Sequence, residues 1–585
     1  MENVEIAREL TEMADLLEID GANPFRIRAY RNAVHTVEDH STPLRKLVEQ
    51  EADLTELPAI GKDIAKWIEE LVRTGGMTIK DELAERIPLS LLELMRLPGV
   101  GPKKARKLWE ELDVETVDDL EAAAKAGEVE ELEGFGKKTQ DKILSAIERY
   151  RKRTGRFKLG DADQYVVPLL EHLRASKAVQ RAEVGGSYRR RLETVGDIDV
   201  LVISDDPEAV MKLFTEYGEV AKVQMAGDTR GRITLRSGLE VDLRTLPPKS
   251  YGAALVYFTG SKDHNIKLRQ RGLDYGFRIS EYGVFEGVEG DRDDEEEHDP
   301  WAGKWVAGKE EKDVYAAVEL PWIEPELREN RGEIEAAIKG TLPELIELDD
   351  IRGDLQMHST WSDGQESIES MAVACAGRGY EYMALTDHSQ SLAMTGGLTP
   401  ERARMQWEEV DEVREAHPEI AVLRSMEVDI LRDGTLDMDD DVLEGLDIVL
   451  ISIHSLFELP PVEQTRRMLK ALQHPLVNIV GHPTGRLINR RDPIDYDIDE
   501  VLACAAENKV ALEINAHPDR LDLKDTLAMA AKKAGAKIVI NTDAHKIGDL
   551  DLMHYGVEQA RRAWLEPGDV LNTLPADGLL DAFSH

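Results

Sequence analysis

The sequence predicts a multidomain chain that begins with an all-α region, continues with an α+β region and ends with an α/β barrel. Its 585 residues are too many for one hydrophobic core. Helical apolar periods broken by glycine turns run to about residue 157, and apolar strands then alternate with helices over 158–322. From residue 350 onwards, strands of the buried type alternate regularly with helices, which predicts a parallel sheet with functional groups at the strand ends.

The chain is strongly acidic: 115 Asp and Glu residues against 73 Lys and Arg give a formal net charge of −42. Proteins that bind nucleic acid usually have a basic surface, because neutralisation of phosphates drives their affinity. A cytoplasm with molar salt would reconcile the two, since the Debye length there falls to about 3 Å. We therefore expect a salt-loving source, and only motifs can indicate DNA binding. The acidic run at 291–299 is expected to be a solvated loop.

Other bulk features indicate a soluble, cytoplasmic protein. The sequence contains no apolar stretch of the roughly eighteen residues that a membrane-spanning helix needs. Its first residues include acidic side chains and lack a basic segment, so they predict a folded helix and not a signal peptide. The two cysteines, Cys375 and Cys504, lie in alanine-rich helical contexts and predict no disulfide framework. No coiled-coil pattern is present, and we expect a monomer.

Glycine turns between helices repeat one pattern in the N-terminal region, at 56–68, 96–108 and 132–143. Glycine permits a tight turn that DNA can approach, and the amides opening the next helix favour a phosphate. One such turn is more often an ordinary helical hairpin. Three copies followed by lysines favour sequence-independent DNA binding and resemble helix-hairpin-helix motifs. The candidate DNA contacts are Gly61, Gly99, Gly101, Lys103, Lys104, Gly134, Gly136 and Lys137.

Three carboxylates mark the α+β region. Asp197 and Asp199 share one face of an apolar strand, because strand side chains alternate, and Asp242 lies in a second apolar strand that could pair beside it. Gathered carboxylates repel one another unless cations bind them, and Mg²⁺ prefers hard oxygen ligands. A lone Asp-x-Asp is usually a solvated strand end. The turn at 185–190, with amides, a hydroxyl and arginines for a triphosphate, favours a two-metal nucleotide centre instead.

The set GS…GDIDV…VDLR resembles the nucleotidyltransferase palm of family X DNA polymerases, the group that includes DNA polymerase beta. The resemblance covers residues 1 to about 322 and implies addition of dNTPs to a primer end in gapped DNA. It implies Mg²⁺ or Mn²⁺ at Asp197, Asp199 and Asp242, with Asp242 nearest the attacking hydroxyl. The nucleotide-binding residues that it implies are Gly186, Ser187, Arg190, Tyr257, Phe258, Asn265 and Arg269.

One position departs from this family. Members with 5′-deoxyribose phosphate lyase activity use a lysine on the helix after the first hairpin, and Trp67 occupies that position here. Lys66 precedes it, but one residue along a helix rotates a side chain by about 100°. The sequence therefore argues against lyase chemistry.

Histidines and carboxylates recur at strand ends in the last third of the chain. Five of these ends carry one of the chain's 15 histidines. A single histidine there is more often structural, but several at the exits of one parallel sheet can converge on one mouth. Imidazole and carboxylate together suit Zn²⁺ or Mn²⁺. The candidate metal ligands are Gln356, His358, Asp363, His388, Glu427, His454, His482, Asp543 and His545.

The segments DLQMHSTWSDG, LTDHS, MEVDI, ISIHS, GHPTGR and NTDAH resemble the polymerase and histidinol phosphatase (PHP) domain. The resemblance implies up to three ions that activate a hydroxide and clamp a scissile phosphate. The implied sites are His358, Glu427 and Asp543; Glu427, His454 and His482; and Asp363, His388 and His545. Gln356 replaces the first histidine of a common His-x-His pair. An amide oxygen binds Zn²⁺ more weakly than imidazole, so we expect the first site to be weaker, partly occupied or Mn²⁺-preferring.

Arg486, Asn515 and Arg520 are further candidates, for contact with a phosphate. Surface salt bridges are an almost equally common use of such residues.

The predicted division is a helical DNA-binding domain at 1–85, a fingers-like helix-hairpin-helix domain at 86–157, a palm at 158–246, a thumb at 247–322, a linker at 323–349 and a PHP domain at 350–585. The favoured function is gap-filling DNA polymerase coupled to 3′-5′ exonuclease or other 3′-end processing. Proofreading, 3′-phosphate removal and abasic-site incision fit the second centre equally. The alternatives are a phosphatase of small metabolites with a non-catalytic DNA-binding N-terminal region, and a non-catalytic scaffold.

Overall fold

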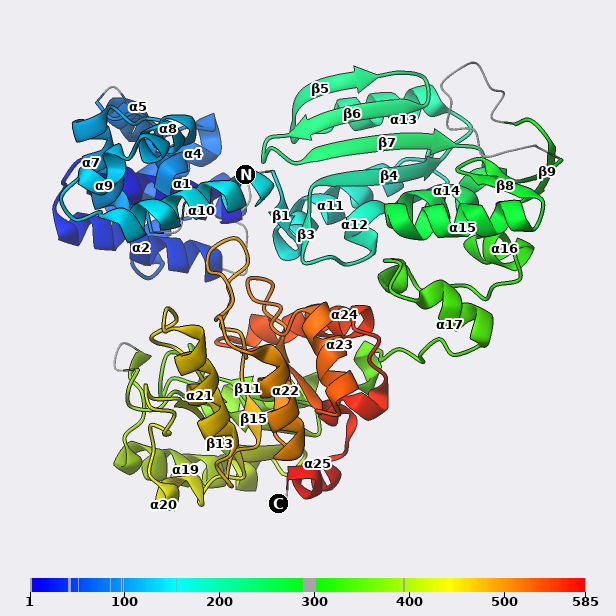
Figure 1. The fold of residues 1–585 in the computed structure, drawn as a ribbon. Helices are drawn as coiled ribbons and strands as arrows, with labels where there is room; N and C mark the ends of the chain where they lie inside the picture. The colour runs from blue at the N-terminus through cyan, green and yellow to red at the C-terminus, as the bar shows by residue number, and fades with distance from the viewer. Residues whose placement is uncertain are drawn as a thin grey trace. The chain divides into compact units, whose positions relative to one another are not determined.

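The computed structural model describes residues 3–39, 44–50, 52–84, 86–95, 97, 99–153, 155–287, 301–392 and 395–583. The chain forms two compact units, residues 1–155 and 156–585 (Figure 1). The acidic run at 291–299, expected to be a loop, lies outside the described residues. Within the described part, no helix combines the length and the apolar character that a bilayer crossing demands.

The first unit is all α, as predicted. Its helices enclose one apolar core that includes Leu10, Ile68 and Leu108. The helices are α1 (Asn3–Ile19), α2 (Pro24–Asp39), α3 (Leu44–Glu49), α4 (Lys62–Thr74), α5 (Thr78–Ala84), α6 (Leu91–Met95), α7 (Pro102–Leu112), α8 (Val117–Ala126), α9 (Glu128–Glu131) and α10 (Lys137–Arg153). Helices α4, α7 and α10 each begin directly after one of the predicted glycine turns.

The second unit opens with a five-stranded mixed sheet, which we call the palm. The strand order is β2-β4-β7-β6-β5, and only β4 and β7 are parallel. Its strands are β2 (Arg181–Val184), β4 (Asp197–Ile203), β5 (Val220–Ala226), β6 (Arg230–Leu235) and β7 (Glu240–Leu246), and its helices are α11 (Leu159–Arg174), α12 (Gly186–Arg189) and α13 (Pro207–Thr215). A two-stranded ribbon, β1 (Phe157–Lys158) and β3 (Thr194–Val195), lies beside them.

The two faces of the palm sheet differ because side chains alternate along each strand. One face is apolar, with Ile198, Val200 and Val241 packed under α11 and α13. On the other face, only the far ends of β4 and β7 are covered: Leu201 and Leu246 pack against α14 (Tyr251–Thr259). The near ends of both strands on that face carry Asp197, Asp199 and Asp242. The fold therefore leaves the carboxylates at the uncovered half of a buried sheet.

The region after the palm, the thumb, combines helices with a small sheet of order β10-β9-β8. Its further elements are α15 (Lys262–Asp274), β8 (Phe277–Ser280), β9 (Gly283–Glu286), β10 (Lys304–Ala307), α16 (Glu311–Ala317) and α17 (Glu333–Lys339). Helix α17 belongs to the stretch predicted as linker, and Ile334 and Ala337 on it pack into the thumb core.

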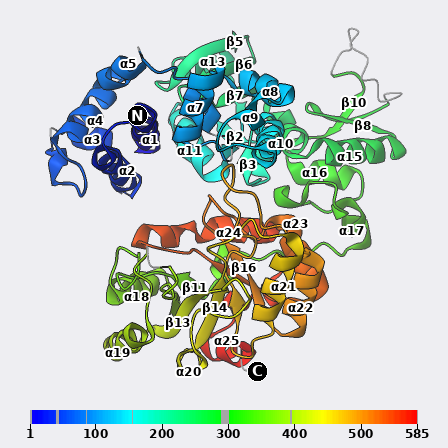
Figure 2. The same cartoon turned by 60° about the vertical axis from the view of Figure 1, so that its left-hand side comes forward.

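Residues 350–583 form a parallel barrel with helices outside, as predicted (Figure 2). The strands follow sequence order: β11 (Gly353–Met357), β12 (Tyr382–Leu385), β13 (Ala421–Asp429), β14 (Ile448–Ser452), β15 (Ile479–Val480), β16 (Ala511–Asn515) and β17 (Ile538–Asn541). A parallel bridge between Met357 and Ala544 brings the first strand beside the last. The helices are α18 (Ile368–Gly377), α19 (Pro400–Ala416), α20 (Asp440–Leu443), α21 (Pro461–Leu472), α22 (Ile498–Glu507), α23 (Asp525–Ala534), α24 (Met553–Arg562) and α25 (Ala576–Phe583).

The barrel interior changes from apolar to polar along the strands. Leu423, Leu450 and Val539 form an apolar inner layer. Glu427 lies four residues beyond Leu423, so its side chain points into the same interior. Glu427 is 1% exposed, and its surroundings are therefore protein groups and not bulk water.

Helix α24 of the barrel contacts the palm. The hydroxyl of Tyr555 donates to Asp163 Oδ2 at 2.5 Å, and the hydroxyl of Tyr188 donates to Oδ1 of the same carboxylate at 2.5 Å. Arg191 Nε lies 2.7 Å from a carboxylate oxygen of Glu558. Arg562 Nη1 donates to the backbone oxygen of Arg190 at 2.6 Å. The end of α12, at Tyr188, Arg190 and Arg191, is therefore held from the barrel side.

Candidate functional site

The palm carboxylates converge. Asp199 lies directly opposite Asp242 in the parallel register of β4 and β7, and Asp197 precedes Asp199 on the same face. Burial, and then the neighbouring charges of Asp197 and Asp242, raise the pKa of Asp199 to about 6. A divalent cation would relieve this repulsion, and the hard carboxylate oxygens suit Mg²⁺ or Mn²⁺. The three residues therefore fit the two-metal centre that the sequence predicts.

Arg232 on β6 is a member of this site that the sequence did not reveal. It lies opposite Asp242 in the β6–β7 register, and its Nε and Nη2 donate to the two carboxylate oxygens of Asp242 at 2.8 and 2.7 Å. Its pairing depends on cross-strand register, which no local motif marks. The guanidinium occupies both oxygens that a metal ion would use.

The turn before β4 approaches the carboxylates closely. Gly186 has φ of 65°, and a Cβ there would lie 2.9 Å from Asp199 Oδ2. Only glycine is compatible with both the backbone angle and the contact. Ser187 follows it on α12.

The arginines after this turn are paired within the protein. Arg190 Nε donates to Glu329 at 2.9 Å and its Nη1 donates to the backbone oxygen of Thr259 at 2.7 Å. Arg189 binds both carboxylate oxygens of Glu311 at 2.9 and 2.7 Å. The predicted triphosphate ligand Arg190 is thus held beside the turn by the thumb.

The remaining predicted nucleotide residues lie where α14 meets α15. The rings of Tyr257 and Phe258 are edge to face, with centroids 5.2 Å apart. Asn265 Nδ2 donates to the backbone oxygens of Tyr257 at 2.7 Å and Gly260 at 3.1 Å, which fixes the junction. Arg269 lies one helical turn after Asn265 on α15 and is half-buried. Phe258 also contacts the glycine turn, because a Cβ at Gly185 would meet it at 3.1 Å.

The predicted DNA-binding turns lie on the surface of the first unit. Gly99, Gly134 and Gly136 have φ of 87°, 88° and 73°, the left-handed conformation that favours glycine. Gly61 and Gly101 cap α4 and α7 with extended backbone. Lys103 and Lys137 are exposed. Lys104 turns back and donates to the backbone oxygen of Gly99 at 2.8 Å.

The helix after the first turn presents Trp67 partly buried against the core, while Lys66 is exposed with its ammonium 4.4 Å from the Trp67 ring centroid.

In the barrel, the predicted ligands gather at the strand ends around Glu427. Its Oε1 lies 2.9 Å from His482 Nε2 and 3.2 Å from His454 Nε2, and its Oε2 lies 3.1 Å from His388 Nδ1. His358 Nε2 lies 3.1 Å from Asp543 Oδ1. Ligand atoms within 4.8 Å of one another define three groups: His358, Asp363, His388 and His545; His388, Glu427 and His454; and His358, Glu427 and Asp543.

The donor set fits metal ions. Both oxygens of Glu427 and the Oε1 of Gln356 are buried and accept no hydrogen bond from the residues that the structure describes. Gln356 Nε2 donates weakly to Asp543 Oδ1 at 3.4 Å. Desolvation opposes the charged form of His388, but Glu427 and Asp363 raise its pKa to about 11. A field that favours imidazolium so strongly also favours a divalent cation.

Buried carboxylates with hydrogen-bond partners lie next to these ligands. Asp387 accepts hydrogen bonds from Ser359 Oγ and Gln406 Nε2, both at 2.6 Å. Glu513 Oε2 accepts from the backbone nitrogen of His482 at 2.6 Å. Burial raises the pKa of Asp354 to about 7, and Thr542 donates to it. The sequence did not single out Asp354 and Glu513, because each reads as one more residue of an apolar strand.

The three phosphate candidates separate in the structure. Arg520 Nε lies 3.5 Å from Asp543 Oδ2, at the edge of the cluster. Asn515 Nδ2 donates to Asp543 Oδ2 at 3.1 Å. Arg486 donates to the backbone oxygens of Arg520 and Leu521 and pairs with Glu193 of the palm at 2.9 Å. Only Arg520 combines proximity to the cluster with a cationic group.

Several regions of the chain match known families. Residues 1–77 match a helix-hairpin-helix domain and 91–149 a SAM-like helix-hairpin-helix tandem. Residues 254–329 match the DNA polymerase beta thumb, and 354–517 match the PHP domain.

Similarity to one curated protein extends over almost the whole chain. The chain is 41% identical over 574 residues to the DNA polymerase/3′-5′ exonuclease PolX of Bacillus subtilis, covering 98% of this chain and 97% of that protein. It is 31% identical to a probable phosphatase of Thermoanaerobacter sp. over 26% of this chain and 64% of the relative. A probable phosphatase of Clostridium acetobutylicum is 34% identical over 23% of this chain and 57% of the relative. The chain therefore belongs to the PolX family, the family X DNA polymerases that carry a PHP domain.

Proposed function

We propose that the chain is a DNA polymerase that fills short gaps during repair and a 3′-5′ exonuclease that processes 3′ ends at a second centre. The observation that carries the proposal is the presence of two separate acidic centres, one on the palm sheet and one in the barrel mouth. The nearly full-length similarity to an enzyme named for both activities supports it. We further propose the domain boundaries given by the sequence, a monomeric state, a cytoplasmic location and a role in base excision repair.

At the polymerase centre, Asp197, Asp199 and Asp242 would hold two Mg²⁺ or Mn²⁺ ions. Bound there, the ions would supply Lewis acid activation of the primer hydroxyl and charge stabilisation at the phosphate. Asp242 lies on the neighbouring strand and would bind on the primer side. The backbone of the 185–187 turn would receive the triphosphate, and Tyr257 and Phe258 would flank the sugar. Arg269 would contact the template strand, and Asn265 the minor-groove edge of the base.

At the exonuclease centre, the barrel ligands would hold up to three Zn²⁺ or Mn²⁺ ions. The ions would supply an activated water at neutral pH. Arg520 would hold a phosphate oxygen, because its guanidinium lies at the edge of the cluster. Asp387 and Glu513 would keep the first ligands oriented, as hydrogen-bonded groups behind a metal site do.

A phosphatase of small metabolites remains the second candidate. The partial matches to two probable phosphatases favour it for the barrel alone. Such an enzyme would hydrolyse small phosphomonoesters and ignore DNA ends. The helix-hairpin-helix matches over the N-terminal region favour DNA as the substrate.

Two substitutions should separate the activities on a gapped duplex with dNTPs. We expect Asp242→Ala to lower primer extension by more than about a hundredfold and to spare 3′ trimming, because it removes a ligand of one centre only. His454→Ala should have the reverse effect. Extension and trimming are both read from one denaturing gel. Equal loss of both activities in both variants would contradict a two-centre enzyme.

Arg232 should compete with metal for Asp242. We expect Arg232→Ala to lower the Mg²⁺ concentration that gives half-maximal extension by several-fold, roughly the effect of one charge-assisted pair at a half-exposed position. Arg230→Ala, on the same strand and opposite Arg244, is the matched control. An unchanged Mg²⁺ requirement in Arg232→Ala would show that Arg232 does not compete with the metal for Asp242.

The amide at 356 should limit metal retention in the barrel. Because its Oε1 is buried without a hydrogen-bond partner among the described residues and its Nε2 contacts Asp543, we expect Gln356→His to bind Zn²⁺ about tenfold more tightly, whereas Gln356→Ala should not. Metal content after dialysis, measured by mass spectrometry, reports this without an activity assay. Equal metal content in the two variants would count against the weak-site interpretation.

We propose a salt-loving source from the net charge of −42. Repulsion among surface carboxylates, and between them and DNA, is screened when the Debye length falls to about 3 Å near 1 M salt. Extension activity and helical circular dichroism should therefore both rise between low and molar KCl. Loss of structure towards molar KCl would be the opposite result.

A further inference from the structure

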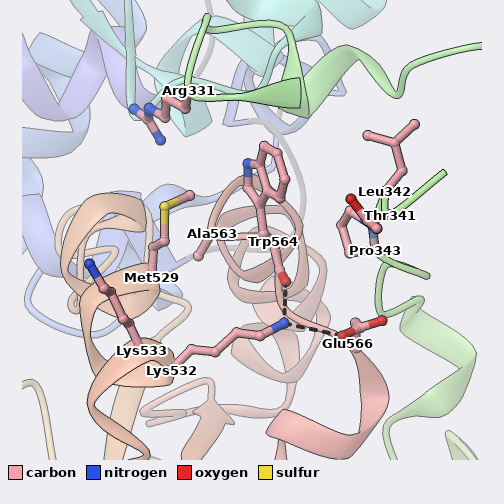
Figure 3. A pocket seen from close by; sticks show the side chains of 10 residues that line it. All are labelled: Arg331, Thr341, Leu342, Pro343, Met529, Lys532, Lys533, Ala563, Trp564 and Glu566. Atoms are coloured by element: carbon pink, nitrogen blue, oxygen red, sulfur yellow. Dashed lines mark hydrogen bonds and ion pairs between the residues drawn. The ribbon is translucent and has the colours of Figure 1, made fainter. Parts of the chain in front are cut away.

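We propose that a pocket between the 323–349 segment and helices α23 and α24 binds a nucleotide unit, apart from both metal centres. Its volume is about 460 Å³, within the range of about 300–1,000 Å³ found for small-ligand sites. Figure 3 shows the residues that line it, which come from the segments just before and just after α17, from α23 and from the segment after α24. None of them is a predicted ligand of either centre.

The pocket is lined by one aromatic side chain, Trp564, which is partly buried and packs against the thumb core. Trp564 follows α24 with φ of 63°, a left-handed conformation that bulky residues rarely adopt. Its backbone oxygen accepts a hydrogen bond from Lys532 at 2.8 Å, which fixes this conformation. The indole lies in the middle of the pocket, with Met529 on one side and Leu342 and Pro343 on the other (Figure 3). A flat apolar ring such as a nucleobase can stack on it.

Two cations lie at the same pocket with charge available for a phosphate. Lys533 is exposed, and no residue in the described part of the chain forms an ion pair or hydrogen bond with it. Arg331 pairs through Nη1 with Asp525 at 2.9 Å, and Asp525 Oδ2 is shared with Arg562 at 2.7 Å. One carboxylate therefore faces two guanidinium groups. Lys532, in contrast, is paired with Glu566 at 3.3 Å and Asp569 at 2.8 Å.

The lining has more basic than acidic residues; Asp525 and Asp569 beside it partly neutralise Arg331 and Lys532, so Lys533 supplies most of the available positive charge. The chain has 115 acidic against 73 basic residues, yet the lining has three basic residues, Arg331, Lys532 and Lys533, and one acidic residue, Glu566. Such a pocket favours an anion and disfavours a metal ion. Stacking surface and phosphate-binding cations together match a nucleotide better than either a neutral aromatic compound or a bare anion.

The ligand has two possible sources with the same chemistry, a free deoxynucleoside monophosphate or one unit of single-stranded DNA. The proposed exonuclease would release the monophosphate and would bind single-stranded DNA as its substrate. The source of the ligand therefore rests on the proposed function, whereas the pocket itself does not. Arg331 begins a series of ion pairs that runs through Asp525, Arg562 and Glu329 to Arg190, beside the glycine turn at 185–187. An occupant that contacts Arg331 would therefore contact the first member of this series.

The test uses the full chain in EDTA, which removes metal-dependent binding at both centres. Binding of dAMP and of a single-stranded hexamer of dA is measured by titration calorimetry, and 8-azido-dAMP is cross-linked and its peptide mapped. We expect the cross-link in the peptide that contains Trp564. Lys533→Ala and Trp564→Leu should each weaken binding about tenfold. Trp564→Phe, which keeps an aromatic ring, and Lys339→Ala, an equal charge change on α17 outside the lining, should leave it close to wild type.

The outcomes distinguish the two ligand sources and test whether this pocket binds a nucleotide. Loss in Lys533→Ala and Trp564→Leu for dAMP alone assigns the pocket to the mononucleotide, and loss for the hexamer alone assigns it to the strand. An equal effect of Lys533→Ala and Lys339→Ala, or a cross-link only at palm or barrel-mouth peptides, would overturn the proposal. Extension and trimming measured with metal in the same wild-type preparation test the proposed function separately.

Discussion

Burial of carboxylates away from water is the constraint on which both centres depend. In the palm, strand register sets Asp199 opposite Asp242, and burial together with these like charges raises the pKa of Asp199 to about 6. In the barrel, Glu427 is almost fully buried, and three histidines surround its two oxygens. Such groups persist only because large apolar cores hold the strands that carry them. In each centre, the packing of apolar cores therefore keeps charged groups in positions that bound cations would stabilise.

The sequence predicted those parts of the structure that follow from chain-local rules. Alternation along β4 places Asp197 and Asp199 on one face, and regular β-then-α order predicts the barrel whose strand ends bear the histidines. The positive φ of Gly99 and Gly134 follows from turn chemistry. The first turn shows the limit of that rule, because Ala59 adopts φ of 56° at the equivalent place. An alanine in this conformation costs about 1 kcal/mol relative to glycine.

The rest depends on partners distant in sequence. Arg232 contacts Asp242 only because β6 and β7 pair in one particular register. Arg190 is held by Glu329, 139 residues away, which no motif indicates. Lys104 bonds to its own turn, although its spacing is that of a lysine poised for DNA. Asp354 and Glu513 look like ordinary strand residues until the closed barrel turns them inward.

Helix α24 of the barrel forms buried polar contacts with the palm. A chain cut before the barrel would leave the Asp163 carboxylate without the Tyr555 hydroxyl and Arg191 without Glu558, so charged groups now enclosed would face solvent. The isolated palm and thumb would then expose charged groups that the barrel covers in the full chain. Because the barrel contacts the residues at the end of α12, evolutionary exchange of the barrel would require simultaneous changes in the palm.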